Sequence, residues 1–112
     1  MSGAVLLGRQ PNTLEVEVAA GGDWSETLRA EVDGEPRDWP AGTDIVLEFR
    51  LPTRTVTWAA VCDGPHATFN VPQVEVDALV RELNGSRAPA RLLHTLDGVR
   101  SAWATGRVEG FR

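Results

Sequence analysis

The stretch that most constrains the fold lies between residues 33 and 51, where two turns precede one alternating segment. Asp33 and Gly34 form a turn in which glycine tolerates a positive φ. Trp39 is the large apolar side chain of a second corner that contains proline and glycine. From residue 44 to residue 51, apolar and polar side chains alternate, which is the period of a strand with one buried face. The stretch therefore predicts a β-protein built from short strands and tight turns.

The same alternation recurs along the chain and predicts further strands of similar length. These segments carry apolar residues at every second position and are separated by turns that contain Gly, Pro or Asp. They cover residues 14–18, 27–32, 55–62, 66–71, 91–96 and 99–103. In the segment 55–62 neither face is charged, which predicts a central strand whose second face is covered or used as an interface.

The last two of these segments are expected to form a hairpin around Asp97 and Gly98. A two-residue loop at this position sets three cross-strand pairs and puts their side chains on one side of the hairpin. The pairs are Leu96 with Val99, His94 with Ser101, and Leu92 with Trp103. The turn chemistry and the apolar pattern agree on this register. Residues 86–89, just before the hairpin, are expected as a loop.

One segment has a helical period. Its apolar residues are spaced i, i+3, i+4 and i+7, and Asn84-Gly85 supplies a C-terminal stop. The spacing predicts a short helix over residues 76–84 that lies across an open end of the sheets. The terminal segments 1–10 and 106–112 are expected as docking arms; residues 4–7 are also compatible with a short first strand, and residues 106–112 with an edge strand.

These elements predict an all-β chain, an antiparallel Ig-like β-sandwich of seven to eight short strands in one domain over residues 1–112. A small barrel is the alternative that the sequence does not separate from a sandwich. The net charge of −5 argues against a basic surface for nucleic acid or an anionic membrane. The N-terminal residues lack the basic region of a signal peptide, and no stretch has membrane-spanning length. We therefore expect the chain to be made in the cytosol.

The residues that usually carry catalysis are few, with two His, one Cys and no Tyr. Cys62 lies in an apolar strand and is expected to pack as a small hydrophobe. His94 faces Ser101 in the predicted hairpin, which favours a buried histidine with a satisfied hydrogen bond, and His66 has no evident partner. The acidic turn residues lack the spacing of a cation loop; they are Asp33, Glu35, Asp38 and Asp44. We expect no catalytic residue, no metal and no cofactor.

The four tryptophans divide into two kinds. Trp58 and Trp103 lie on predicted core faces. Trp24 and Trp39 each follow an aspartate, Asp23 and Asp38, in a corner rich in Gly or Pro. Their rings either plug the ends of the sandwich or remain partly exposed as anchors for a partner, since Trp is enriched at interface hot spots. These two Asp-Trp corners are the candidate interface.

The pattern of turns and tryptophans resembles the LtfC-like β-sandwich family of structural proteins from actinobacterial phages. The residues that carry the resemblance are Asp23-Trp24, Asp33-Gly34, Trp39-Pro40-Ala41-Gly42-Thr43, Trp58 and Asp63-Gly64, within residues 10–85. The basic residues are all arginine, which fits a GC-rich host.

The resemblance implies a non-enzymatic virion structural protein located in the particle. It would be a capsid decoration or minor capsid protein, or a minor tail or adaptor protein, and it would assemble with other virion proteins. Edge strands and terminal segments would make the contacts by β-augmentation or arm exchange. The alternative is an Ig-like module that binds carbohydrate or peptide with Trp24 or Trp39 as its platform. A small enzyme that uses His94 or Cys62 ranks last.

Overall fold

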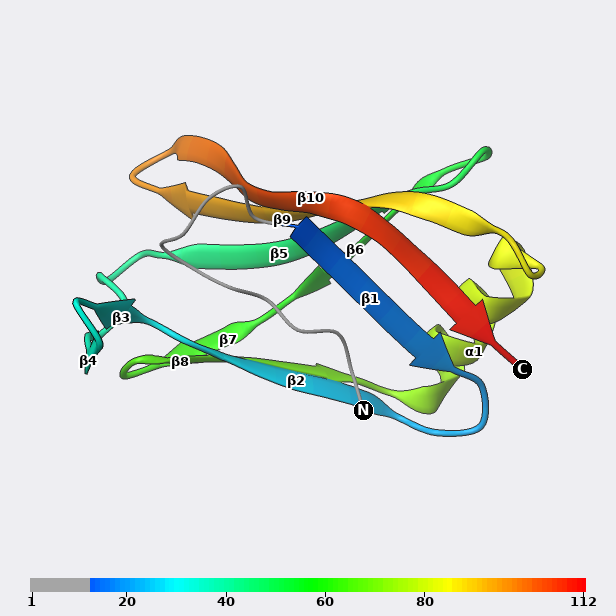
Figure 1. Cartoon of the computed structure of the whole chain (residues 1–112), viewed down its shortest axis with the longest axis horizontal. Coiled ribbons are helices and arrows are strands. Elements are labelled where there is room, and N and C mark those ends of the chain that lie inside the picture. The colour runs from blue at the N-terminus through cyan, green and yellow to red at the C-terminus, as the bar shows by residue number, and fades with distance from the viewer. Residues whose placement is uncertain (1–12) are drawn as a thin grey trace.

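The structure, a computed structural model, describes residues 13–112, which form two facing β-sheets with one helix at one end (Figure 1). The elements in chain order are β1 (Thr13–Ala19), β2 (Trp24–Arg29), β3 (Glu31–Val32), β4 (Glu35–Pro36), β5 (Asp44–Arg50), β6 (Thr55–Ala59), β7 (Val61–Asp63), β8 (His66–Val71), α1 (Gln73–Leu83), β9 (Arg87–Leu96) and β10 (Val99–Phe111). The predicted β-sandwich class is confirmed. The described part of the chain has ten strands rather than seven or eight, because the predicted segments 27–32 and 55–62 each divide into two strands and the short strand β4 is added.

The larger sheet has five strands in the order β1-β10-β9-β5-β6, and the smaller has the order β2-β8-β7. The strands β3 and β4 form a separate two-stranded ribbon, which lies at the end of the molecule opposite α1 (Figure 1). Within the two larger sheets the pairs are antiparallel except β1 with β10, which is parallel. The sandwich is therefore mixed at one edge, where the sequence predicts antiparallel pairing throughout.

Between the sheets lies one core built from the predicted alternating positions. The strands of the two larger sheets contribute their inward residues, and the largest fully buried side chains come from both sheets and from the helix. They are Phe49, Phe69, Leu14, Ile45, Leu79, Leu92, Val18, Val76 and Val108. The apolar faces predicted for residues 14–18, 44–51 and 66–71 are thereby confirmed.

The segment 55–62 is not a central strand, and that prediction is wrong. It divides at Ala60, whose backbone N–H donates to the Ile45 carbonyl at 2.9 Å, into β6 and β7. The first of these is an edge of the five-stranded sheet, and the second is an edge of the three-stranded sheet. Its lack of charge therefore does not mark burial on both faces, since Thr55, Thr57 and Ala59 are exposed.

The hairpin of β9 and β10 follows the predicted turn but not the whole predicted register. Asp97 and Gly98 both have positive φ, 53° and 78°, and Leu96 pairs with Val99 as expected. A bulge between Ala102 and Ala104 then adds one residue to β10. As a result Leu92 pairs with Ala104 and not with Trp103, while the pair His94–Ser101 on the near side of the bulge is confirmed.

Residues at both ends of this hairpin belong to the sheet rather than to loops or arms. β9 begins at Arg87, so the loop predicted over residues 86–89 is wrong. Proline is tolerated at position 89 within this strand because β9 pairs with β5 only from Ala90 onward. The segment 106–111, expected as a docking arm, is the end of β10 and lies between β1 and β9. The other expected arm, residues 1–10, and the short strand expected at 4–7 lie outside the described residues.

Gly106 lies where β10 approaches the backbone of β1 most closely among the glycines of this strand. A Cβ atom at this position would lie 1.7 Å from the carbonyl oxygen of Leu14 on β1, which is far inside van der Waals contact. The close approach of β1 to β10 therefore requires glycine.

The helix α1 confirms its prediction. Its buried residues are the four of the i, i+3, i+4, i+7 pattern, and it ends at Asn84, which has a left-handed φ of 48°. It packs against β1 and β10 near the C-terminus of the chain (Figure 1). It begins at Gln73, three residues before the apolar pattern starts, because the side chain of Asp23, which lies between β1 and β2, caps its first turn.

Candidate functional site

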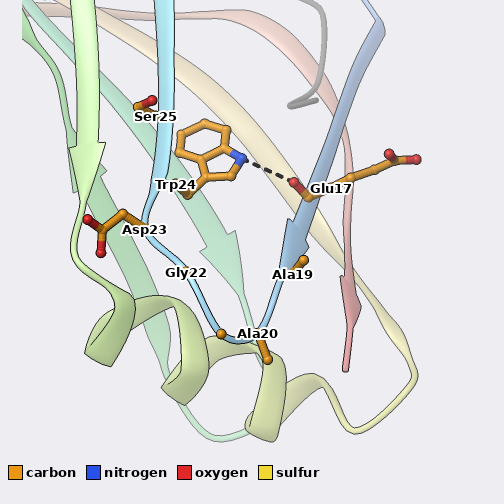
Figure 2. Close-up of a pocket in the computed structure, with 8 residues that line it drawn as sticks. Glu17, Ala19, Ala20, Gly22, Asp23, Trp24 and Ser25 are labelled. Atoms are coloured by element: carbon orange, nitrogen blue, oxygen red, sulfur yellow. Dashed lines mark hydrogen bonds between the residues drawn. The ribbon is translucent and has the colours of Figure 1, made fainter.

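The first Asp-Trp corner, between β1 and β2, places its tryptophan in the core. Trp24 begins β2 and is only 7% exposed. Its ring packs against Trp58, at a centroid distance of 5.5 Å, and against Phe69, at 6.0 Å. Its indole N–H donates to the backbone carbonyl of Glu17 at 3.1 Å, while the Glu17 carboxylate points away from the ring (Figure 2). The ring therefore offers no open face to a partner or a sugar.

Asp23 in the same corner is a helix cap supplied from a distance. Its Oδ1 accepts a hydrogen bond from the backbone N–H of Gln73, the first residue of α1, at 2.7 Å. The residue at the N-cap position of α1 is Pro72, whose side chain cannot accept such a bond. The backbone N–H of Gly21 donates in turn to Asp77 on the helix at 2.9 Å. The loop and the helix therefore hold each other, and a carboxylate at the N-terminus also complements the helix dipole.

Figure 2 shows the hollow that this loop encloses, lined mainly by Glu17, Ala19, Ala20, Gly22, Asp23 and Trp24. The Trp24 indole N–H and the Asp23 carboxylate in this lining already have partners within the protein, in the indole-to-carbonyl bond and in the cap. We regard the hollow as a consequence of the loop–helix contact.

The second corner lies between β4 and β5, at the opposite end from α1 (Figure 1). Gly42 has a φ of 83°, and the hydroxyl of Thr43 donates to the Pro40 carbonyl at 2.6 Å, so the turn is closed by its own residues. The backbone N–H of Trp39 donates to the Gly64 carbonyl at 2.9 Å, which ties the corner to the β7–β8 turn.

Trp39 belongs to an aromatic cluster that we call the end cluster, made of Trp39, His94 and Trp103. The Trp39 and Trp103 rings stack at 5.6 Å, and the His94 and Trp103 rings stack at 4.1 Å with only 9° between their planes. Trp39 is half-buried, and its indole nitrogen is buried without a hydrogen-bond partner within the described part of the chain. Asp38 beside it is exposed. The two corners that look alike in sequence therefore differ, since one is core and the other is a partly exposed end.

The two residues considered for catalysis lie at the margin of the core. Burial lowers the pKa of His94, and its ring is stacked on Trp103 while Ser101, its pair in the register, is exposed. Burial, and then the nearby Asp44 carboxylate, raise the pKa of the Cys62 thiol. The thiol donates weakly to the Thr43 carbonyl at 3.8 Å. A nucleophilic thiol needs the opposite shift.

The acidic, histidine and cysteine side chains of residues 13–112 do not gather into a metal site. No three His, Cys, Asp or Glu side chains in this range lie close enough together to hold a metal ion. The acidic residues Asp33, Glu35, Asp38 and Asp44 are spread over the turn, β4, the corner and β5, and all four are exposed. Over the same range, no helix has the length and apolar character needed to cross a bilayer.

Sequence reasoning missed a partly buried ion pair on the five-stranded sheet. Glu48 on β5 accepts hydrogen bonds from Arg91 on β9 at 2.7 and 2.9 Å, and a longer one from Arg50 at 3.4 Å. The hydrogen bond from Arg91 lowers the pKa of Glu48 despite the opposing effect of burial, and Arg50 contributes further. Only the cross-strand register, in which Glu48 faces Arg91, reveals the pair.

The four edges of the two sheets differ in charge. β1 carries Glu15 and Glu17, β2 carries Glu26 and Arg29, and β7 is three residues long and carries Asp63. β6, with the sequence TVTWA, carries no charge. Natural proteins blunt sheet edges with charges, proline or short length, because a bare edge pairs with other chains. Among the strands that the structure describes, β6 is the edge that lacks this protection.

Comparison with known proteins identifies the family. The family model described as "LtfC-like, beta-sandwich domain" matches residues 10–110, nearly the whole chain. The chain therefore belongs to the LtfC-like β-sandwich family, as its turns and tryptophans predict. No curated protein matches the chain.

Proposed function

We propose that this member of the LtfC-like β-sandwich family is a non-enzymatic structural protein of a phage virion, which docks on the capsid or on the tail. The observation that carries the proposal is the open, uncharged edge strand β6. Such an edge presents a row of backbone N–H and C=O groups, with which a strand from another chain, either a different protein or a second copy of this one, can pair. Proteins that assemble into particles need contacts of this kind.

The resemblance to structural proteins of actinobacterial phages supports the same function. The side chains that an enzyme would use also support it, because they are engaged in packing. Cys62 has a raised pKa and His94 is stacked against Trp103. Trp24, one of the two rings considered as a platform for a carbohydrate or peptide, is a core residue.

Two places on the particle fit a domain of this size. As a capsid decoration or minor capsid protein it would lie on the head, and as a minor tail or adaptor protein it would lie on the tail. In either place its partners are other virion proteins, and the net charge of −5 is unsuited to nucleic acid or an anionic membrane surface. The protein would be made in the host cytoplasm and then enter the particle.

Co-sedimentation tests this proposal. Heads and tails are isolated separately from particles that lack the chain, and each is mixed with a concentration series of the purified full-length chain. We expect saturable binding to one of the two at a fixed ratio, while the chain sedimented alone stays in the supernatant. Binding to neither heads nor tails would contradict the proposal.

A further inference from the structure

We propose that β6 pairs two copies of this chain edge to edge. The two β6 strands would run antiparallel about a two-fold axis and join the two five-stranded sheets into one continuous sheet. This inference rests on the geometry of the strand and holds whether the protein lies on the capsid or on the tail.

The backbone of β6 is oriented for such a contact. Two hydrogen bonds fix its phase against β5, from Ala60 N–H to the Ile45 carbonyl at 2.9 Å and from the Leu51 N–H to the Arg54 carbonyl at 2.8 Å. In an antiparallel pair, only every second residue exchanges hydrogen bonds with its direct partner. The backbone N–H and C=O groups of Val56 and Trp58 therefore form their hydrogen bonds with β5. The N–H and C=O groups of the three residues between and beside them point to the open side; these residues are Thr55, Thr57 and Ala59.

The side chains of these same three residues suit a second copy. All three are exposed, and none is charged. When Thr57 lies opposite Thr57 of the other copy, Thr55 lies opposite Ala59, and the arrangement repeats itself across the axis as a two-fold interface requires. Threonine pairs are favourable across strands, whereas like charges in direct opposition are not. This register makes about six backbone hydrogen bonds between the copies.

β2 carries the charged residues Glu26 and Arg29, and β1 and β7 do not offer this self-complementarity. Antiparallel self-pairing of β1 brings Glu15 and Glu17 of the two copies together, and β7 has only three residues and ends in Asp63. The position of β6 is also fixed by the core, because its residue Trp58 is buried there. A single pair of strands buries little surface, so we expect a weak dimer in free solution, with a Kd on the order of tens of micromolar.

Sedimentation velocity of the full chain over a range of concentrations tests the pairing. Thr57→Lys puts two lysines opposite each other at the axis, and we expect it to weaken the dimer at least tenfold. Thr27→Lys is the matched control, since Thr27 is an exposed threonine on β2, an edge of the other sheet. This control should dimerise as the parent does. Circular dichroism confirms that both variants remain folded.

Cysteine cross-linking tests the register. In a Cys62→Ala background, Thr57→Cys should form a disulfide-linked dimer with itself, because directly paired Cα atoms lie about 5.5 Å apart, within the range of a disulfide. Thr55→Cys alone should not cross-link. A mixture of Thr55→Cys and Ala59→Cys chains should.

Each outcome separates this inference from the proposed function. A chain that stays monomeric at millimolar concentration, or a dimer that Thr57→Lys leaves intact, would overturn the pairing and leave the virion proposal standing. If the chain is monomeric but Thr57→Lys abolishes its sedimentation with heads or tails, β6 pairs with a different protein, and the two-copy inference is wrong. A dimer with the expected register that binds neither heads nor tails would support the pairing and contradict the virion proposal.

Discussion

The replacement of Trp58 by alanine tests the packing of the core more severely than other single changes. Trp58 lies on β6, is 4% exposed and contacts aromatic rings from both sheets. Its ring meets Phe49 edge-on at 5.0 Å and an angle of 87°, and it meets Trp24 at 5.5 Å. Loss of this ring removes contacts from three strands at once, which are β2, β5 and β6.

Two considerations set the size of the effect. Burial of an aromatic side chain removes about 150–250 Å² from water, which at about 25 cal/mol per Å² gives an upper value of about 4–6 kcal/mol. Alanine keeps part of this burial, and measured changes of a buried aromatic residue to alanine cost about 3–5 kcal/mol. We expect a loss of about 4 kcal/mol for Trp58→Ala, which is a large part of the roughly 5–15 kcal/mol that stabilises a typical domain.

Urea denaturation followed by far-UV circular dichroism measures this loss, because the substitution itself changes the tryptophan fluorescence. Glu17→Ala is the control. Glu17 is exposed and lies opposite Glu109 in the register, and the hydrogen bond to Trp24 uses its backbone carbonyl. Its removal should change the free energy of unfolding by less than about 0.5 kcal/mol. If Trp58→Ala unfolds at the same urea concentration as the parent, the inward orientation of β6 is wrong.

Three further changes test other parts of the fold. Gly106→Ala should lower the unfolding midpoint sharply in thermal denaturation, since its Cβ would meet a backbone carbonyl of β1; an unchanged midpoint would contradict the parallel pairing of β1 and β10. Asp23→Ala should cost about 1 kcal/mol in urea denaturation through loss of the cap on Gln73, and Asp23→Asn should recover most of it. Glu48→Gln should cost about 2 kcal/mol at pH 7 through the weakened pair with Arg91. The pKa of Glu48 is lowered in the folded state, so this contribution to stability is present above the ordinary pKa of 4.5 and is lost as the pH falls below that value. The unfolding free energies of the parent and the variant should therefore converge in acid denaturation. A difference between them that persists at pH 2 would refute the assignment.

Local sequence patterns were sufficient for the elements whose environment is uniform along their length. β5 is a regular alternating strand in the middle of a sheet, and α1 has one apolar stripe against the core. The turn at Asp97 and Gly98 was predictable because only a few residue types accept positive φ at both positions. In each case a short range of residues contains the whole signal.

The errors arise where the fold depends on distant partners. The division of 55–62 at Ala60 follows from the chain crossing from one sheet to the other, which no local pattern marks. The bulge beside Trp103 and the place of residues 106–111 inside the sheet depend equally on the strands that lie next to them. Sequence periodicity reports which face of a strand is apolar, but not which strands flank it.

The candidate site shows the same division. Asp23-Trp24 and Asp38-Trp39 look equivalent in sequence, yet one ring is enclosed by Trp58 and Phe69 and the other lies at a partly exposed end. The lack of charge in β6 was visible in the sequence, but its meaning changed once the strand was found at an edge. An uncharged central strand is ordinary, whereas an uncharged edge indicates a partner.

Quantitative mass spectrometry of purified phage particles tests the proposal that this chain is a virion protein most directly. The amount of the chain is scaled to the major capsid protein in particles purified by density gradient. We predict that the chain is present at a reproducible copy number, with hundreds of copies placing it on the capsid and a few to some dozens placing it on the tail or connector. Absence of the chain from infectious particles would contradict the virion proposal.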